Sequence, residues 1–179
     1  MAVLAILGVP VGSVFAATTA DVTVTATPTY IALTNSLATW AIGAVAESNA
    51  DSYWWDADGN GYGAAPTDSF DDAECPATIT NTGSVAEDID VKVTSTTWSG
   101  GVGWTVAAAV GANTVVVKAG ASGAANEAAM LVLTGSDQEL VDNLAAAGTK
   151  DWILHLETGT FTDGVEKTGT VRLTASATN

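Results

Sequence analysis

The chain has 179 residues, of which 47% are hydrophobic and only 14% are charged. This length suits one domain with a well-developed core, and the composition excludes an intrinsically disordered chain. Asp and Glu number 20 against 5 Lys and Arg, for a net charge of −15. Such a surface repels phosphate groups, so nucleic acid and anionic lipid are not expected partners. A single cysteine, Cys75, also excludes an intramolecular disulfide.

The first 16 residues are apolar or small and carry no charge. They end in Val14-Phe15-Ala16, a small-x-small sequence of the kind that signal peptidase recognises. Glycine and proline interrupt the segment, which is shorter than the ~20 apolar residues that span a bilayer. We therefore expect residues 1–16 to be a signal peptide or a retained apolar segment. The mature protein is expected at the cell surface or outside the cell, without a membrane partner after processing.

Residues 21–27 alternate between two kinds of side chain. Val22, Val24 and Ala26 share one face, and threonines occupy the other, which is the period-two pattern of a strand. Pro28 separates this strand from the rest of the chain. Residues 17–28 are therefore predicted to form an N-terminal strand. It either pairs with its own sheet or is donated to the open edge of a neighbouring molecule.

The remaining chain, residues 29–179, is predicted to be one β-domain. Apolar residues alternate over 89–93 and 169–175, and further strand patterns lie at 30–34, 38–45, 77–81, 104–106, 114–118, 130–134 and 152–157. One short helix is expected at about 136–148, because Ser136 and Glu139 form a capping box and Gly148 follows as a C′ residue. A long acidic loop is expected at about 48–74. Together these elements predict an all-β, immunoglobulin-like antiparallel sandwich.

Two stretches carry a family resemblance. Residues 40–47 (WAIGAVAE) resemble a strand of hydin-like and major-sperm-protein-like immunoglobulin domains. Residues 77–84 (ATITNTGS) are similar to the strand and Asn-Thr-Gly turn of the same domains, and alternation at 89–93 follows as in that family. Ile42 stands where the family has phenylalanine, and Glu47-Ser48 replaces its glycine turn. The resemblance implies a sandwich fold, and the overall layout also resembles exported filament subunits of the donor-strand type.

The acidic loop contains the sharpest motif in the chain. Asp56, Asp58 and Asn60 occupy positions one, three and five of an EF-hand-type calcium loop, and Tyr62 offers a carbonyl at position seven. Position twelve is Thr67 rather than glutamate, so Asp68 is the candidate for a further carboxylate. The sequence therefore predicts a Ca²⁺ site here, with a metal-free Asx-turn loop as the alternative.

Tyr53, Trp54 and Trp55 form an aromatic group at the start of the same loop. Adjacent residues of a strand face opposite ways, so at least one indole is expected to be exposed or covered by a partner. Three uses stay open: a core lid, a subunit contact and an aromatic platform for glycans. The only histidine, His155, lies within a strand pattern without a nucleophile motif nearby, so we expect a structural role.

These features predict a structural protein and not an enzyme. Its partner would be further copies of itself, joined into a pilus-like filament or surface array by donated strands. A carbohydrate-binding surface module and a virion surface or decoration protein are the alternatives.

Overall fold

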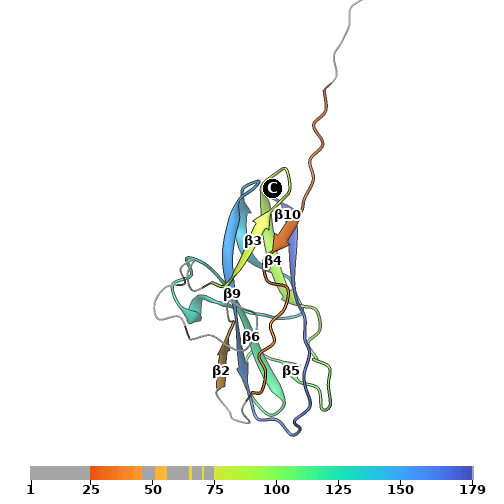
Figure 1. The fold of residues 1–179 in the computed structure, drawn as a ribbon, viewed down its shortest axis with the longest axis vertical. Coiled ribbons are helices and arrows are strands. Elements are labelled where there is room, and N and C mark those ends of the chain that lie inside the picture. The colour runs from red at the N-terminus through yellow and green to blue at the C-terminus, as the bar shows by residue number, and fades with distance from the viewer. Residues whose placement is uncertain (1–24, 46–50, 56–64, 66–69, 71–74, 179) are drawn as a thin grey trace, which may run out of the picture.

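The computed structural model describes residues 25–45, 51–55, 65, 70 and 75–178. Within these residues there is no helix of the length and hydropathy that crossing a membrane requires. Two sheets make up the fold (Figure 1), and their strands have the following bounds: β1 Leu33–Asn35, β2 Asp51–Trp54, β3 Ala77–Asn81, β4 Glu87–Val93, β5 Thr105–Val106, β6 Thr114–Ala121, β7 Leu131–Val132, β8 Gln138–Leu144, β9 Thr149–Thr158 and β10 Val171–Ala177.

The larger sheet has the order β1-β3-β9-β6-β5, with β2 also paired to β9 and β7 to β6. The smaller sheet has the order β10-β4-β8. All neighbours are antiparallel except β5 and β6, which run parallel. The prediction of an all-β sandwich is confirmed.

The core lies between the two sheets, where alternate residues of each strand point inward. Ile89, Val91 and Val93 of β4 are fully buried, as their alternation predicted. Val115 and Val117 of β6 are buried on the facing side of the larger sheet. A short turn between β3 and β4 connects the larger sheet to the smaller one. Burial of these aliphatic side chains supplies the main driving force for folding.

The larger sheet is also covered on its outer face. Gly120 of β6 lies there, and a Cβ at this position would stand 3.0 Å from Met130 and 3.2 Å from Phe70. Trp54 packs against Phe70 with ring centroids 5.9 Å apart. Of the segment predicted as a loop at 48–74, residues 51–54 form strand β2, Trp54 and Phe70 cover this face, and most of the remainder lies outside the described residues.

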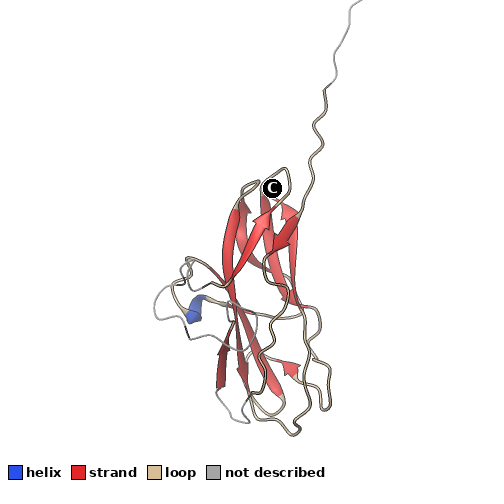
Figure 2. Cartoon of the chain, viewed as in Figure 1, coloured by secondary structure: helices blue, strands red, loops and turns tan. Residues whose placement is uncertain are grey.

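The predicted helix at 136–148 is wrong. Residues 138–144 form strand β8, which pairs with β4, and the one helical turn in the described residues is the 3₁₀ turn Glu127–Ala129 (Figure 2). The register shifts twice along β8, so that Val141 and Leu144, three residues apart, both face the core. Two bulges thus produce in a strand the spacing that resembles one face of a helix.

The strand predicted at 30–34 is shorter and shifted, since β1 covers Leu33–Asn35. The amide of Ala32 donates a hydrogen bond to Oε1 of the buried Glu87, at 2.8 Å. The apolar stretch at 38–45 forms no extended strand in the described residues, although Trp40, Ile42 and Val45 pack against the core. Part of the stretch on which the family resemblance rests therefore differs from the strand it implied.

Residues 25–29 are extended and exposed, and they lead away from the body of the domain (Figure 1). In the described part of the chain, no hydrogen bond joins them to either sheet. The first contacts are made by Tyr30, whose amide donates to Ser84 Oγ and whose carbonyl accepts from the Ser84 amide, both at 3.0 Å. The N-terminal segment therefore departs from the β1 edge of the larger sheet.

Candidate functional site

The candidate calcium ligands Asp56, Asp58, Asn60, Tyr62 and Asp68 lie outside the described residues, and so do Val22 and Val24 of the donor strand. Ala26, the third donor residue, is described and is exposed in a segment without secondary structure. The Ca²⁺ site and the donor strand therefore stay predictions.

Tyr53, Trp54 and Trp55 are each only 5% exposed, so within this chain none of the three rings presents an open face. Trp54 stacks on the imidazole of His155 with centroids 4.0 Å apart and planes 7° apart. Trp55 meets Trp152 edge-on at 5.1 Å. A glycan platform needs an open ring face. These rings instead act as core cover, which was one of the three uses left open.

An open groove lies where the smaller sheet ends. The larger sheet continues from β9 to β6, β7 and β5, whereas the smaller sheet stops at β8, so among the described strands none faces part of β6. The groove has a volume of about 660 Å³. Its apolar lining comes from both sheets and the segments beside them: Ala119, Ala121, Ala124, Ala129, Leu131, Leu140, Val141 and Leu144.

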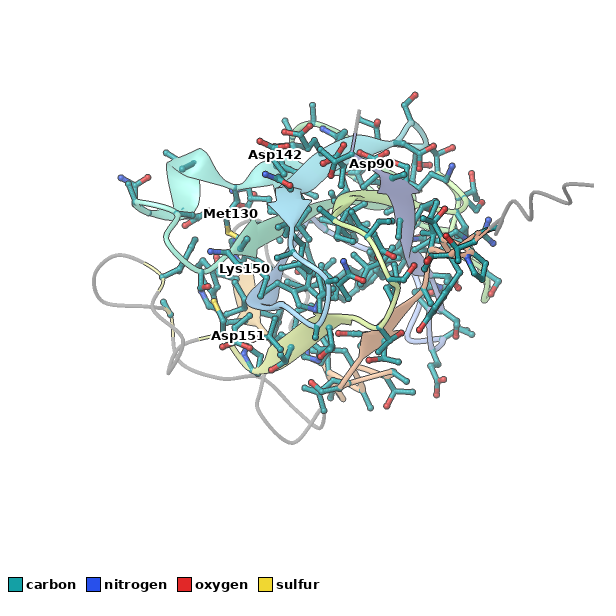
Figure 3. All side chains as sticks on the ribbon, turned by 90° about the horizontal axis from the view of Figure 1, so that it is seen from above. Asp90, Met130, Asp142, Lys150 and Asp151 are labelled. Carbon is teal, nitrogen blue, oxygen red and sulfur yellow. The ribbon has the colours of Figure 1, made fainter. Side chains whose placement is uncertain are left out.

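The rim of this groove is polar. Asp142 of β8 and Lys150 of β9 line it from the two sheets, as seen along the long axis of the domain in Figure 3. β8 pairs with β4 on one side, and in the described residues no strand pairs with its other side. An unpaired edge beside an apolar groove offers both backbone hydrogen bonds and side-chain pockets to an added strand.

A second candidate site lies on the outer face of the larger sheet, and its residues do not line the groove. It consists of Lys118 of β6, His155 and Glu157 of β9, and Glu127 of the 3₁₀ turn. We call these four residues the His155 cluster. Lys118 and His155 are directly paired across β6 and β9, and Glu157 lies two residues from His155 on the same face. The pairing of β6 with β9 thus positions Lys118, His155 and Glu157, and the 3₁₀ turn places Glu127 beside them.

Ionic contacts hold the cluster together. Lys118 Nζ lies 2.5 Å from Glu127 Oε1 and also donates to Glu157 Oε1. His155 Nδ1 lies 3.4 Å from Glu127 Oε1 and 3.9 Å from Glu157 Oε1. The His155 side chain is fully buried, whereas the Glu127 side chain is 44% exposed, so the cluster opens to solvent on the Glu127 side.

The surroundings shift the pKa values of Lys118, Glu127 and His155. Burial lowers the pKa of His155, and the nearby Glu127 only partly opposes it, so the ring is neutral at pH 7. The hydrogen bond from Lys118 lowers the pKa of Glu127. Burial also acts to lower the pKa of Lys118, but its hydrogen bonds to Glu127 and Glu157 outweigh this and raise the pKa. The cluster therefore holds one ammonium, two carboxylates and a neutral imidazole.

His155 is the unusual member of this set. Neither of its ring nitrogens has a hydrogen-bond partner in the described part of the chain, although the ring is fully buried. Buried polar atoms are nearly always paired, so this ring calls for a physical explanation.

The sequence placed His155 in a strand but did not group it with the two glutamates. The His-x-Glu alternation at 155 and 157 was the available signal, whereas the approach of Glu127 depends on tertiary structure.

Comparisons with protein-family models, with curated proteins and with solved structures found no match to this chain. The resemblance to hydin-like and major-sperm-protein-like domains therefore stays a prediction.

Proposed function

We propose that this protein is a structural subunit of an extracellular filament or similar surface assembly. Residues 17–28 of one copy add as a strand to the groove beside β8 of the next copy. The observation that carries this proposal is the separation of two complementary features. The extended N-terminal segment leaves from the β1 edge, whereas the open groove lies beside β8 and over β6, across β3 and β9 in the larger sheet.

The dimensions and side chains of the groove support this occupant. β8 has seven residues, and residues 21–27 of the donor also number seven, or about 23 Å of extended chain. Ala119 and Ala121 leave space in the groove, which suits the larger side chains of Val22 and Val24. The period-two alternation would turn these valines inward while the donor threonines face solvent.

The geometry of the contact favours a filament over a closed dimer. A donor at one edge and an acceptor at another make a heterologous contact, which generates an open array unless the rotation closes a ring. Backbone hydrogen bonds to β8 would supply affinity, and the two valines would select the register. This assembly also covers the free edge of β8, which is otherwise exposed to unwanted pairing.

Paired substitutions on the two faces of the donor test the proposal. In the purified full-length chain, Val22→Asp with Val24→Asp is expected to abolish polymers seen by electron microscopy and light scattering. Thr23→Asp with Thr25→Asp adds the same charge on the opposite face and is the matched control, which is expected to assemble. Polymers in the valine variant, or a wild-type chain that stays monomeric at high concentration, would refute the proposal.

The groove is tested separately. Ala121→Trp fills the acceptor side and is expected to leave a folded monomer that still donates its own strand. Mixed with wild type, it should cap filaments and shorten them. Filaments of unchanged length would place the acceptor elsewhere. The expected effect comes from filling the apolar groove and not from unfolding. The melting temperature of the variant is therefore measured first, to show that it is folded.

The same proposal includes a Ca²⁺ ion that stiffens the subunit. Its ligands would be Asp56, Asp58, Asn60, Tyr62 and Asp68. Removal of Ca²⁺ by a chelator is expected to weaken assembly if this loop lies at the joint. Tyr53, Trp54 and Trp55 are each 5% exposed, so no observation in the described residues favours glycan binding over a filament, and none favours a virion role.

A further inference from the structure

We propose that Glu127, His155 and Glu157 form a binding site for a transition-metal dication of the Zn²⁺ type, and that Lys118 occupies the cation position when the metal is absent. This inference does not depend on the proposed filament, because none of the three ligands lines the acceptor groove.

The ligand atoms are spaced as a zinc site requires. Zinc binds histidine nitrogen and carboxylate oxygen at about 2.0–2.2 Å, so two ligands of a tetrahedral site lie about 3.3 Å apart. Nδ1 of His155 lies 3.4 Å from Glu127 Oε1 and 3.9 Å from Glu157 Oε1. All three ligand atoms fall within 4.8 Å of one another. Shifts of a few tenths of an ångström would therefore bring His155 Nδ1 and each carboxylate oxygen to the spacing of zinc ligands.

The buried imidazole provides a second, independent observation. His155 is fully buried, its ring nitrogens lack hydrogen-bond partners in the described residues, and Nδ1 faces both carboxylates. A neutral imidazole carries a lone pair on one nitrogen, which is the donor that zinc uses. A metal between the three residues would satisfy this atom, whereas the Lys118 ammonium satisfies only the carboxylates.

The surrounding structure supports the ligands and leaves an opening. Trp54 stacks on the imidazole with ring centroids 4.0 Å apart and planes 7° apart, which restricts the tilt of the ring. Glu127 is the most exposed ligand and offers the path of entry. Three protein ligands leave the fourth tetrahedral position to water or to a group from a partner.

The donor set selects the class of metal. Imidazole suits zinc and its neighbours, whereas Ca²⁺ requires six to eight oxygen ligands. The site is therefore distinct from the calcium loop predicted at 56–68, and Ca²⁺ should not compete for it. Lys118 carries a positive charge into the same position, so metal binding must displace its ammonium from the carboxylates.

Zn²⁺ and Co²⁺ titrations of the chelator-treated full-length chain test this inference. Wild type is expected to bind Zn²⁺ with one site by calorimetry. Co²⁺ should give visible absorption bands and quench tryptophan fluorescence, and the quenching should diminish in Trp54→Phe. Glu127→Gln is expected to lower affinity at least tenfold, since it removes a direct ligand. Glu139→Gln on β8 removes an equal, exposed charge and is the matched control.

Lys118→Met decides between a metal site and a closed ion-pair network. Because it removes the competing ammonium, this variant is expected to bind Zn²⁺ more tightly and to gain more thermal stability from Zn²⁺ than wild type. Excess Ca²⁺ should leave both results unchanged. Absence of Zn²⁺ binding in wild type, or equal Zn²⁺ affinity in wild type and Glu127→Gln, would overturn the proposal. If Lys118→Met does not fold, the Glu127 and Trp54 variants still distinguish the metal site from the ion-pair network.

Discussion

Substitution of Asn81 by alanine is expected to cost about 3 kcal/mol of unfolding free energy. The side chain is fully buried at the end of β3. Its Nδ2 donates to the carbonyls of Val85 and Leu144, each at 2.8 Å, and its Oδ1 accepts from the Gly83 amide at 2.8 Å. Each such bond contributes about 1 kcal/mol net, and three are lost together.

The cost has a structural consequence beyond stability. Asn81 joins the β3–β4 turn to β8, whose Leu144 lines the acceptor groove. Alanine would remove the side-chain partner of two carbonyls and one amide at the junction of β3, the turn and β8. We therefore expect Asn81→Ala to loosen the end of β8 and to weaken assembly as well as stability.

Urea and thermal unfolding measure this effect. A loss of about 3 kcal/mol corresponds to a fall in melting temperature of about 6–12 °C for a chain of this size. Asn81→Asp keeps the acceptor for Gly83 but loses both donors, so it should be destabilised at least as much. Thr80→Ala, on the same strand but the opposite face, is the control and should change stability by about 0.5 kcal/mol or less. A loss below about 1 kcal/mol in Asn81→Ala would show that these bonds do not hold β3, the turn and β8 together.

Three further outcomes are expected. Gly159→Ala should impair folding, measured by circular dichroism, because its Cβ would lie 1.8 Å from the carbonyl oxygen of Gly111. Phe70→Ala should lower the unfolding free energy by about 3–5 kcal/mol, since a fully buried ring is lost; denaturant titration checks this. Hydrogen bonding from Lys167 lowers the pKa of Asp163 below its ordinary 3.8. The stability that this carboxylate contributes should therefore be complete above that value and be lost as pH falls through the lowered pKa. Asp163→Asn should abolish this component in acid denaturation curves.

The sequence predicted the strands whose own residues alternate regularly between the core and the outer face. Alternation at 89–93 reflects a central strand with one face in the core, so the pattern followed directly from burial. The turn at Asn81-Thr82-Gly83 was also readable, because Asn and Gly favour turns for local reasons, and Asn81 Oδ1 indeed bonds the Gly83 amide. Both features depend on residues near one another in the chain.

The helix prediction shows where local signals fail. A capping box contributes about 1 kcal/mol, which is less than the gain from pairing residues 138–144 with β4 and burying Val141 and Leu144. Bulges gave this strand a helix-like spacing. Apolar residues spaced three or four positions apart occur both in a helix and in a bulged strand. Which of the two forms depends on the partner strand, which lies elsewhere in the sequence.

The candidate sites also combine features that the local sequence predicts with features that depend on tertiary structure. The alternation of residues 21–27 was visible in the sequence because a strand repeats every two residues. The groove beside β8 was not visible, because it arises from a difference in the extent of two sheets. Likewise, Glu127 meets His155 and Glu157 only after β6 and β9 pair and the 3₁₀ turn folds over them. Local composition and periodicity thus predicted the regularly alternating strands, whereas long-range pairing decided that residues 138–144 form a strand, which edges stay open and which charged groups meet.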